Sequence, residues 1–128
     1  MKKLRNQLLV RLSKSIVSLG YGFLVKVYQK AMQLELLQRG LQSELEYPIK
    51  IHFKGVTIGD YYADLFVERK VIVELKVAKV YSPRDKAQLL NELKATGTEV
   101  GLLINFGSNQ SASFRVDPRL NVDTVKSP

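Results

Sequence analysis

Hydrophobic residues in the first third of the chain follow helical spacing. Apolar positions recur every three or four residues over 8–19, with charged and small polar residues between them, which predicts an amphipathic helix. Gly20 and Gly22 then interrupt the pattern. A second apolar face runs over 23–39, and Gly40 stands where a helix C-terminal cap is expected. The chain is therefore expected to begin with two helices.

Beyond Gly40 the pattern changes to that of strands. Residues 47–53 alternate apolar and polar side chains, and segments 56–67 and 71–77 are rich in β-branched and aromatic residues. Pro83 opens a helical pattern that extends to about Ala95, and 100–105 is a nearly continuous apolar run of the kind found in a buried strand. The predicted order is two helices, three strands, a helix and a strand.

This order indicates an α/β fold in which three strands form an antiparallel meander. A chain of 128 residues can bury one core and is too short for two ordinary domains, so we expect a single domain over 1–106. Residues 107–128 lack sustained periodicity. We expect them to form a mobile C-terminal tail, with a short strand near 114–116.

Composition narrows the function classes. The chain has no cysteine, which excludes disulfides, thiolate metal sites and cysteine nucleophiles, and which fits a cytoplasmic location. The net charge is +8, and every charged residue before Glu35 is Lys or Arg. Such a basic N-terminal helix can contact nucleic acid phosphates or an anionic membrane surface, or can simply be a solvated helix face. No segment is long and apolar enough for a membrane span.

The candidate chemistry lies on the second and third strands. Glu74 and Lys76 are two residues apart, so they project from the same face of one strand. A three-residue loop at 68–70 pairs Val67 with Val71 and sets Asp64 opposite Glu74. A loop one residue shorter separates the two carboxylates, so the prediction depends on this hairpin register.

In that register Asp64 and Glu74 offer hard oxygen ligands for Mg²⁺ or Mn²⁺, and Lys76 lies beside the same substrate phosphate. The alternative is that the three residues decorate an exposed face of an antiparallel sheet, where cross-strand charge pairs are common. The apolar Phe66 and Ile72 on the same face argue against simple solvent exposure. His52, the only histidine, lacks a partner for a metal site and is interpreted as structural.

Several short segments resemble the GxxExxY proteins of the PD-(D/E)XK nuclease-like superfamily. Asp64 and the Glu74-Leu75-Lys76 tripeptide are similar to the D and E-x-K signature of that superfamily. The resemblance implies a restriction-endonuclease-like core and a divalent-metal phosphodiesterase site. The other matching segments, in chain order, are Leu19-Gly20-Tyr21-Gly22-Phe23, Val27-Tyr28, Tyr47-Pro48-Ile49, Lys54-Gly55, Ala87-Gln88-Leu89-Leu90 and Gly101-Leu102-Leu103-Ile104-Asn105-Phe106.

The resemblance also assigns a role to Gln88 and reveals two departures. Gln88 matches a glutamine that points toward the site and contacts metal-bound water or phosphate; without the resemblance it would be a surface amide. The family has a glutamate on the early helix where this chain has Val25, and Glu35 lies too far along to replace it. The family usually has a tyrosine where this chain has Glu92, which either joins the site or is an exposed helical glutamate.

Two functions follow as hypotheses. The first is a Mg²⁺- or Mn²⁺-dependent nuclease that cleaves DNA or RNA with Asp64, Glu74, Lys76 and Gln88, while the basic N-terminal helix contacts the nucleic acid backbone. The second is a catalytically impaired module on the same fold that binds nucleic acid or a protein partner. A homodimer is expected if both strands of a duplex are cleaved.

Overall fold

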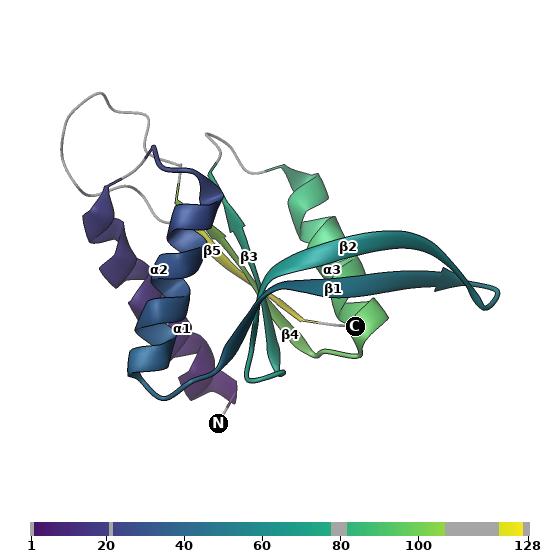
Figure 1. The fold of residues 1–128 in the computed structure, drawn as a ribbon, viewed down its shortest axis with the longest axis horizontal. Helices are drawn as coiled ribbons and strands as arrows, with labels where there is room; N and C mark the ends of the chain where they lie inside the picture. Colours follow the sequence, from purple (N-terminus) through teal and green to yellow (C-terminus); the bar gives the residue numbers. More distant parts are fainter. Residues whose placement is uncertain (1, 21, 78–81, 107–120, 127–128) are drawn as a thin grey trace.

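The chain folds into a single sheet with helices on both faces (Figure 1). The structure is a computed structural model that describes residues 2–20, 22–77, 82–106 and 121–126. The helices are α1 (Lys2–Ile16), the short 3₁₀ helix η1 (Val17–Leu19), α2 (Val25–Gln38) and α3 (Pro83–Thr96). The strands are β1 (Ser43–Phe53), β2 (Val56–Val67), β3 (Val71–Lys76), β4 (Val100–Asn105) and β5 (Asn121–Lys126).

The sheet has five strands in the order β1-β2-β3-β4-β5. The first three form the predicted antiparallel meander, and β4 runs parallel to β3 after the crossover through α3. The α/β fold class predicted from the pattern is confirmed, and the mixed sheet agrees with a restriction-endonuclease-like core.

The fifth strand corrects one expectation. Residues 107–128 were expected to form a mobile tail, yet the backbone of 121–126 pairs antiparallel with β4 along its whole length. The outer edge of β4 carries backbone groups that need hydrogen-bond partners, and β5 supplies them. The local sequence carries no alternating apolar pattern, so only the edge it completes identifies it as a strand. The strand expected near 114–116 lies outside the described residues.

Strand β3 divides the core into two halves. Its odd-numbered residues, including Val73 and Leu75, face α1 and α2, while Ile72 and the residues in phase with it face α3. The buried core on the first face consists of Leu9, Leu12, Ile16, Tyr28, Met32, Leu36, Leu65, Val67, Val71, Val73, Leu75, Leu102, Ile104 and Phe106. The core on the second face is smaller and consists of Ile49, Ala63, Phe66, Ile72, Leu89, Leu93 and Leu103.

Helix α3 is fixed at both ends and along its buried side. Ser82 and Asp85 form a capping box around Pro83, and Gly97 ends the helix at a φ of 70°. A Cβ on Gly101 would lie 2.8 Å from a methyl carbon of Leu89, so the glycine permits α3 to approach β4 closely. These contacts determine which α3 side chains reach the sheet.

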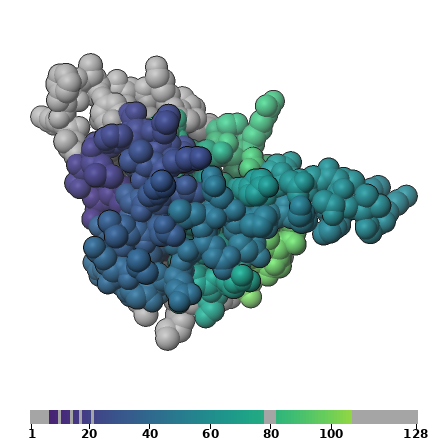
Figure 2. All heavy atoms as spheres, viewed as in Figure 1, coloured from purple at the N-terminus to yellow at the C-terminus, as the bar shows by residue number. Residues whose placement is uncertain are grey.

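The β1–β2 hairpin extends beyond the packed body as an arm (Figures 1 and 2). Its outer part exposes Phe53, Val56 and Ile58, while its inner part packs against α3 through Ile49 and Ile51. Among the helices that the structure describes, none combines the length and apolar character that crossing a membrane requires.

Candidate active site

The hairpin register that the site requires is present. Residues 68–70 form the predicted three-residue connection, and Val67 pairs with Val71 and Leu65 with Val73. Asp64 and Glu74 are the next positions along the two strands, although the strand pairing itself ends at Leu65 and Val73. The backbone N–H of Leu75 donates to Asp64 Oδ2 at 2.7 Å, which attaches the carboxylate to the neighbouring strand. The register therefore directs Asp64 and Glu74 to the same region.

Glu74 is buried rather than exposed. It retains 5% of its accessible surface, which contradicts the interpretation of the site as solvent-exposed decoration. Burial raises the pKa of Glu74 to about 10, and the neighbouring Glu92 and Asp64 carboxylates add to the shift, while Lys76 opposes it. This environment favours the protonated form of Glu74 at neutral pH.

Asp64 responds to the same environment more weakly. Its burial raises the pKa of the carboxyl group, while the hydrogen bond from Leu75 and the charge of Lys76 lower it. The Glu74 carboxyl group also lowers the pKa of Asp64, whereas the Asp64 charge raises the pKa of Glu74. Because each affects the ionisation of the other, the two acids titrate as a coupled pair.

Lys76 lies on the same face as Glu74 and is half-buried. Its Nζ lies 3.5 Å from Oδ1 of Asp85, the acid in the first turn of α3. Asn105, which is fully buried, is its neighbour on β4. Asp85 was not among the predicted site residues. The capping-box pattern of Ser82 and Asp85 could have indicated Asp85 from the sequence. It places a carboxylate in the first turn of the helix, where the chain returns toward β3.

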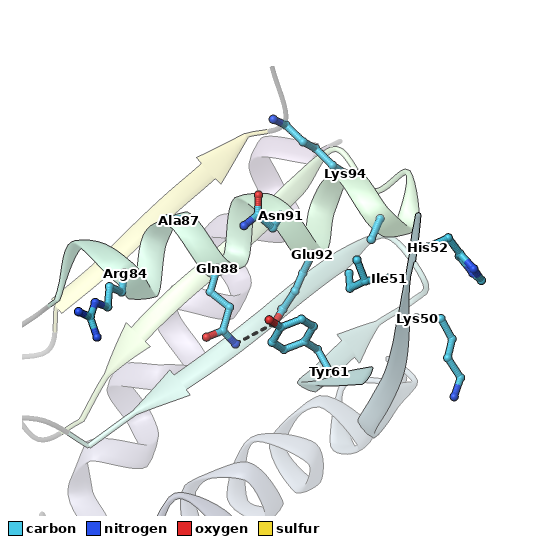
Figure 3. A pocket seen from close by; sticks show the side chains of 11 residues that line it. Lys50, Ile51, His52, Tyr61, Arg84, Ala87, Gln88, Asn91, Glu92 and Lys94 are labelled. Carbon is cyan, nitrogen blue, oxygen red and sulfur yellow. Dashed lines mark hydrogen bonds between the residues drawn. The ribbon is translucent and has the colours of Figure 1, made fainter. Parts of the chain in front are cut away.

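Helix α3 contributes two polar side chains that point at the sheet. Gln88 Nε2 donates to Glu92 Oε2 at 3.0 Å, and Figure 3 shows both side chains directed toward the hairpin. Glu92 is only 1% exposed, and its carboxyl group is close enough to that of Glu74 to raise the pKa of Glu74. The interpretation of Glu92 as an exposed helical glutamate is therefore wrong. The structure brings Gln88, Glu92, Glu74 and Asp64 into one connected group.

Helix α2 reaches the site strand through a residue that the sequence analysis did not single out. Val25, where the resembled family has a glutamate, packs against the core of the first face. One turn later, the buried Gln29 donates from Nε2 to the backbone oxygen of Asp64 at 2.8 Å. The sequence could have indicated Gln29, because it lies on the same helix face as the buried Met32 and Leu36. Glu35 lies on the same helix, ten residues beyond Val25.

A cavity of about 710 Å³ lies between α3 and the β1–β2 hairpin, and Gln88 and Glu92 line it. Figure 3 shows the ring of Tyr61 facing these two side chains, whereas the side chains of Lys50 and His52 point away from α3. His52 is exposed and contacts the Thr57 hydroxyl at 3.3 Å, in agreement with a structural role. The cavity therefore borders the acidic group at Glu92, while Asp64 and Glu74 are not among the residues that line it.

The donors present suit a hard divalent cation. The buried oxygens Glu74 Oε1 and Glu92 Oε1 have no hydrogen-bond partner among the described residues. Mg²⁺ and Mn²⁺ prefer carboxylate oxygens and are commonly held by one or two carboxylates, with water and substrate phosphate completing the shell. Within the described ranges, no three His, Asp or Glu side chains already form a complete metal-binding group.

The comparison with protein families matches residues 3–116 with the PD-(D/E)XK nuclease superfamily. The chain belongs to the PD-(D/E)XK nuclease superfamily. This match includes both signature strands and α3, so the superfamily assignment covers every candidate residue named above. No curated protein matches the sequence.

Solved structures show the same fold in larger proteins. The crystal structure of SSO0001 has a TM-score of 0.53 and 17% identity, covering 80% of this chain and 50% of that one. The alkaline exonuclease LHK-Exo from Laribacter hongkongensis has a TM-score of 0.56 and 11% identity, covering 81% and 55% respectively. This PD-(D/E)XK chain spans about half the length of these neighbours.

Proposed function

We propose that this protein is a divalent-metal-dependent nuclease that hydrolyses phosphodiester bonds of DNA or RNA. The observation that carries the proposal is the convergence of Asp64 and the buried Glu74 on the α3 face of the sheet, with Lys76 on the same strand. Membership of a nuclease superfamily and similarity in fold to an alkaline exonuclease support it.

In this proposal Asp64 and Glu74 hold Mg²⁺ or Mn²⁺, in keeping with the general use of divalent metals by PD-(D/E)XK nucleases. A bound cation supplies Lewis acidity at the phosphate and an activated water. Lys76, held by Asp85, offsets negative charge on the phosphate, and Gln88 orients groups at the mouth of the site. Because Glu74 would have to be deprotonated to hold a cation, its raised pKa predicts that cation affinity rises with pH.

Within the superfamily we propose the GxxExxY group as the nearest kind of protein. The support is the collinear set of segments around Asp64, Glu74-Leu75-Lys76 and Gln88. The chain departs from that group at Val25, where the group has a glutamate. The valine side chain has no oxygen with which to bind a metal or accept a proton. The acid that the group places on the early helix has to be supplied elsewhere or dispensed with.

The substrate strand is proposed to lie in the cavity between α3 and the hairpin. Arg84 and Lys94 on α3 line this cavity and can contact phosphates, and Tyr61 offers a ring on which a base can stack. The basic helix α1 packs on the opposite face of the sheet, so its expected contact with nucleic acid stays a prediction and is remote from the acidic group. The expected homodimer and cytoplasmic setting also stay predictions; the absence of cysteine supports the latter.

One observation favours a second candidate, a nuclease-fold module that binds nucleic acid or a protein without cutting. Helix α2 presents Val25 to the first-face core and makes only an amide contact with Asp64. If the remaining acids do not bind a cation, the domain keeps its fold and cavity and functions only in binding.

The test is cleavage of labelled single- and double-stranded DNA and RNA by wild type and Lys76→Ala. Activity in Mg²⁺ or Mn²⁺ that disappears in EDTA and returns when metal is added back supports the nuclease. We expect Lys76→Ala to lose at least about 100-fold in rate, as removal of a charge-stabilising group does. Binding of these substrates without cleavage in either metal contradicts the nuclease and supports the module.

A further inference from the structure

Glu92 occupies an unusual place for a charged side chain. It lies in the buried stripe of α3 beside Leu93, and only 1% of its surface is exposed. Burying a carboxylate is costly unless a cation or several hydrogen bonds compensate. Helix α3 needs no acid at this position for its own stability, since its cap and its apolar contacts are formed elsewhere.

The contacts of Glu92 leave part of this cost uncompensated. Its Oε2 accepts one hydrogen bond from the neutral amide of Gln88 at 3.0 Å. Its other neighbour in the group is a second acid, Glu74. One oxygen of each, Glu92 Oε1 and Glu74 Oε1, is buried without a hydrogen-bond partner among the described residues. Two interacting acids that each keep an unpartnered buried oxygen offer the kind of oxygen ligands that a divalent cation prefers.

The geometry also connects this pair to the substrate side of the molecule. Glu92 lines the cavity between α3 and the hairpin, and Tyr61 lines the same cavity (Figure 3). A cation held between Glu74 and Glu92 therefore borders the space in which a phosphate fits. By contrast, Val25 on α2 packs into the core on the opposite face.

We infer that Glu92 is a ligand of the divalent cation together with Glu74, so that α3 supplies the carboxylate that α2 lacks. The inference rests on the proposed function for the presence of a cation at Asp64 and Glu74. It adds a ligand from a different helix. Gln88 then acts as a positioning residue, because its amide fixes the orientation of the Glu92 carboxylate.

The experiment is calorimetric titration of Mn²⁺ into the full chain as wild type, Glu92→Gln and Glu92→Asp, with Glu35→Gln as the matched control on α2. Glu92→Gln keeps the shape and loses the charge. We expect its Mn²⁺ affinity to fall at least about tenfold, Glu92→Asp to fall less, and Glu35→Gln to match wild type. The upward shift in melting temperature on adding Mn²⁺ should shrink in the same order.

A structural role predicts different results. If Glu92 only holds Gln88, then Glu92→Gln binds Mn²⁺ as wild type does, and the inference is overturned. Circular dichroism identifies any variant that fails to fold, and Glu92→Asp retains a carboxylate for the comparison in that case. Wild-type cleavage measured on the same samples separates the two proposals. If Mn²⁺ binding depends on Glu92 but no substrate is cleaved, the proposed nuclease function is overturned and the ligand role of Glu92 stands. If Glu92→Gln leaves cleavage unchanged, the ligand role of Glu92 is overturned and the nuclease function stands.

Discussion

The two faces of the sheet bury different kinds of side chain from the same strand, β3. On the α1–α2 face, β3 presents Val73 and Leu75 to a core made of apolar side chains. On the α3 face, the same strand presents Ile72 and then Glu74, a buried acid in contact with a second acid. Neighbouring residues of one strand therefore meet opposite environments.

The difference shows how a small domain combines stability with a reactive group. The first face supplies the larger apolar core, and burial of apolar surface is the dominant favourable term in folding. The second face keeps a smaller core around Leu89 and Leu93 and leaves carboxylate oxygens unsatisfied beside it. Unsatisfied buried groups are destabilising, and they persist where a ligand satisfies them.

The largest effect on stability is expected on the first face. Leu75→Ala removes a side chain that is 2% exposed and leaves a cavity between β3 and the helices. We expect the free energy of unfolding to fall by about 2–5 kcal/mol. Urea denaturation measures it, and a loss well under 1 kcal/mol would show that the first face is not the main stabilising core.

On the second face the adjacent residue should behave in the opposite way. Glu74→Gln removes the buried acid, so we expect the metal-free variant to be more stable than wild type at neutral pH, by about 1 kcal/mol or more. The folded wild type keeps the Glu74 proton up to a pKa of about 10, whereas the unfolded chain releases it near the ordinary value of 4.5. Wild-type stability therefore falls as pH rises through this window.

The slope of that loss is at most about 1.4 kcal/mol per pH unit, and the variant lacks it. Denaturation in EDTA at several pH values between about 5 and 9 measures the difference between the two proteins. The advantage of Glu74→Gln should grow with pH. Parallel stability profiles would contradict the assignment of Glu74 as a buried, protonated acid.

A smaller effect on stability is expected at Gln29, which connects α2 to the strand that carries Asp64. Gln29→Leu removes the hydrogen bond to the Asp64 backbone oxygen and leaves that acceptor buried, which should cost about 1–2 kcal/mol. Because Asp64 is then held less firmly, Mn²⁺ affinity should fall about tenfold. Gln38→Leu, at the exposed end of α2, is the control. Equal Mn²⁺ binding by both variants would show that Gln29 is structural only.

The smallest effect on stability is expected at the cavity rim, where Arg84 and Lys94 are exposed. Arg84→Ala with Lys94→Ala should leave the melting temperature unchanged, weaken nucleic acid binding, and reduce the salt slope by about one for each cation removed. Fluorescence anisotropy against salt concentration measures this. Arg11→Ala on α1 tests the opposite face. A larger loss from Arg11→Ala would place the nucleic acid on the α1 side.

Much of the fold was predictable because local pattern and turn chemistry agreed. The segments 56–67 and 100–105 were predicted with the bounds of β2 and β4, and the three-residue loop at 68–70 gave the register that pairs Val67 with Val71 and Leu65 with Val73. Strand β5 was missed, because its pairing depends on the free edge of β4 rather than on its own alternation.

The candidate site was predicted less completely than the fold. The strand residues followed from register, whereas the burial of Glu92 depends on how α3 approaches β4 at Gly101, which no local pattern encodes. Gln29 and Asp85 were missed for a related reason. Each acts through a backbone oxygen or an ion pair with a residue distant in sequence.

The most direct test of the central claim combines metal binding and cleavage in Glu74→Ala. Mn²⁺ is titrated calorimetrically into wild type and variant, and cleavage of DNA and RNA is followed in the same buffers. The account predicts that wild type binds Mn²⁺ and cuts, and that both properties vanish in a variant that remains folded. Cleavage that persists in Glu74→Ala, or wild-type protein that takes up no metal, would contradict it.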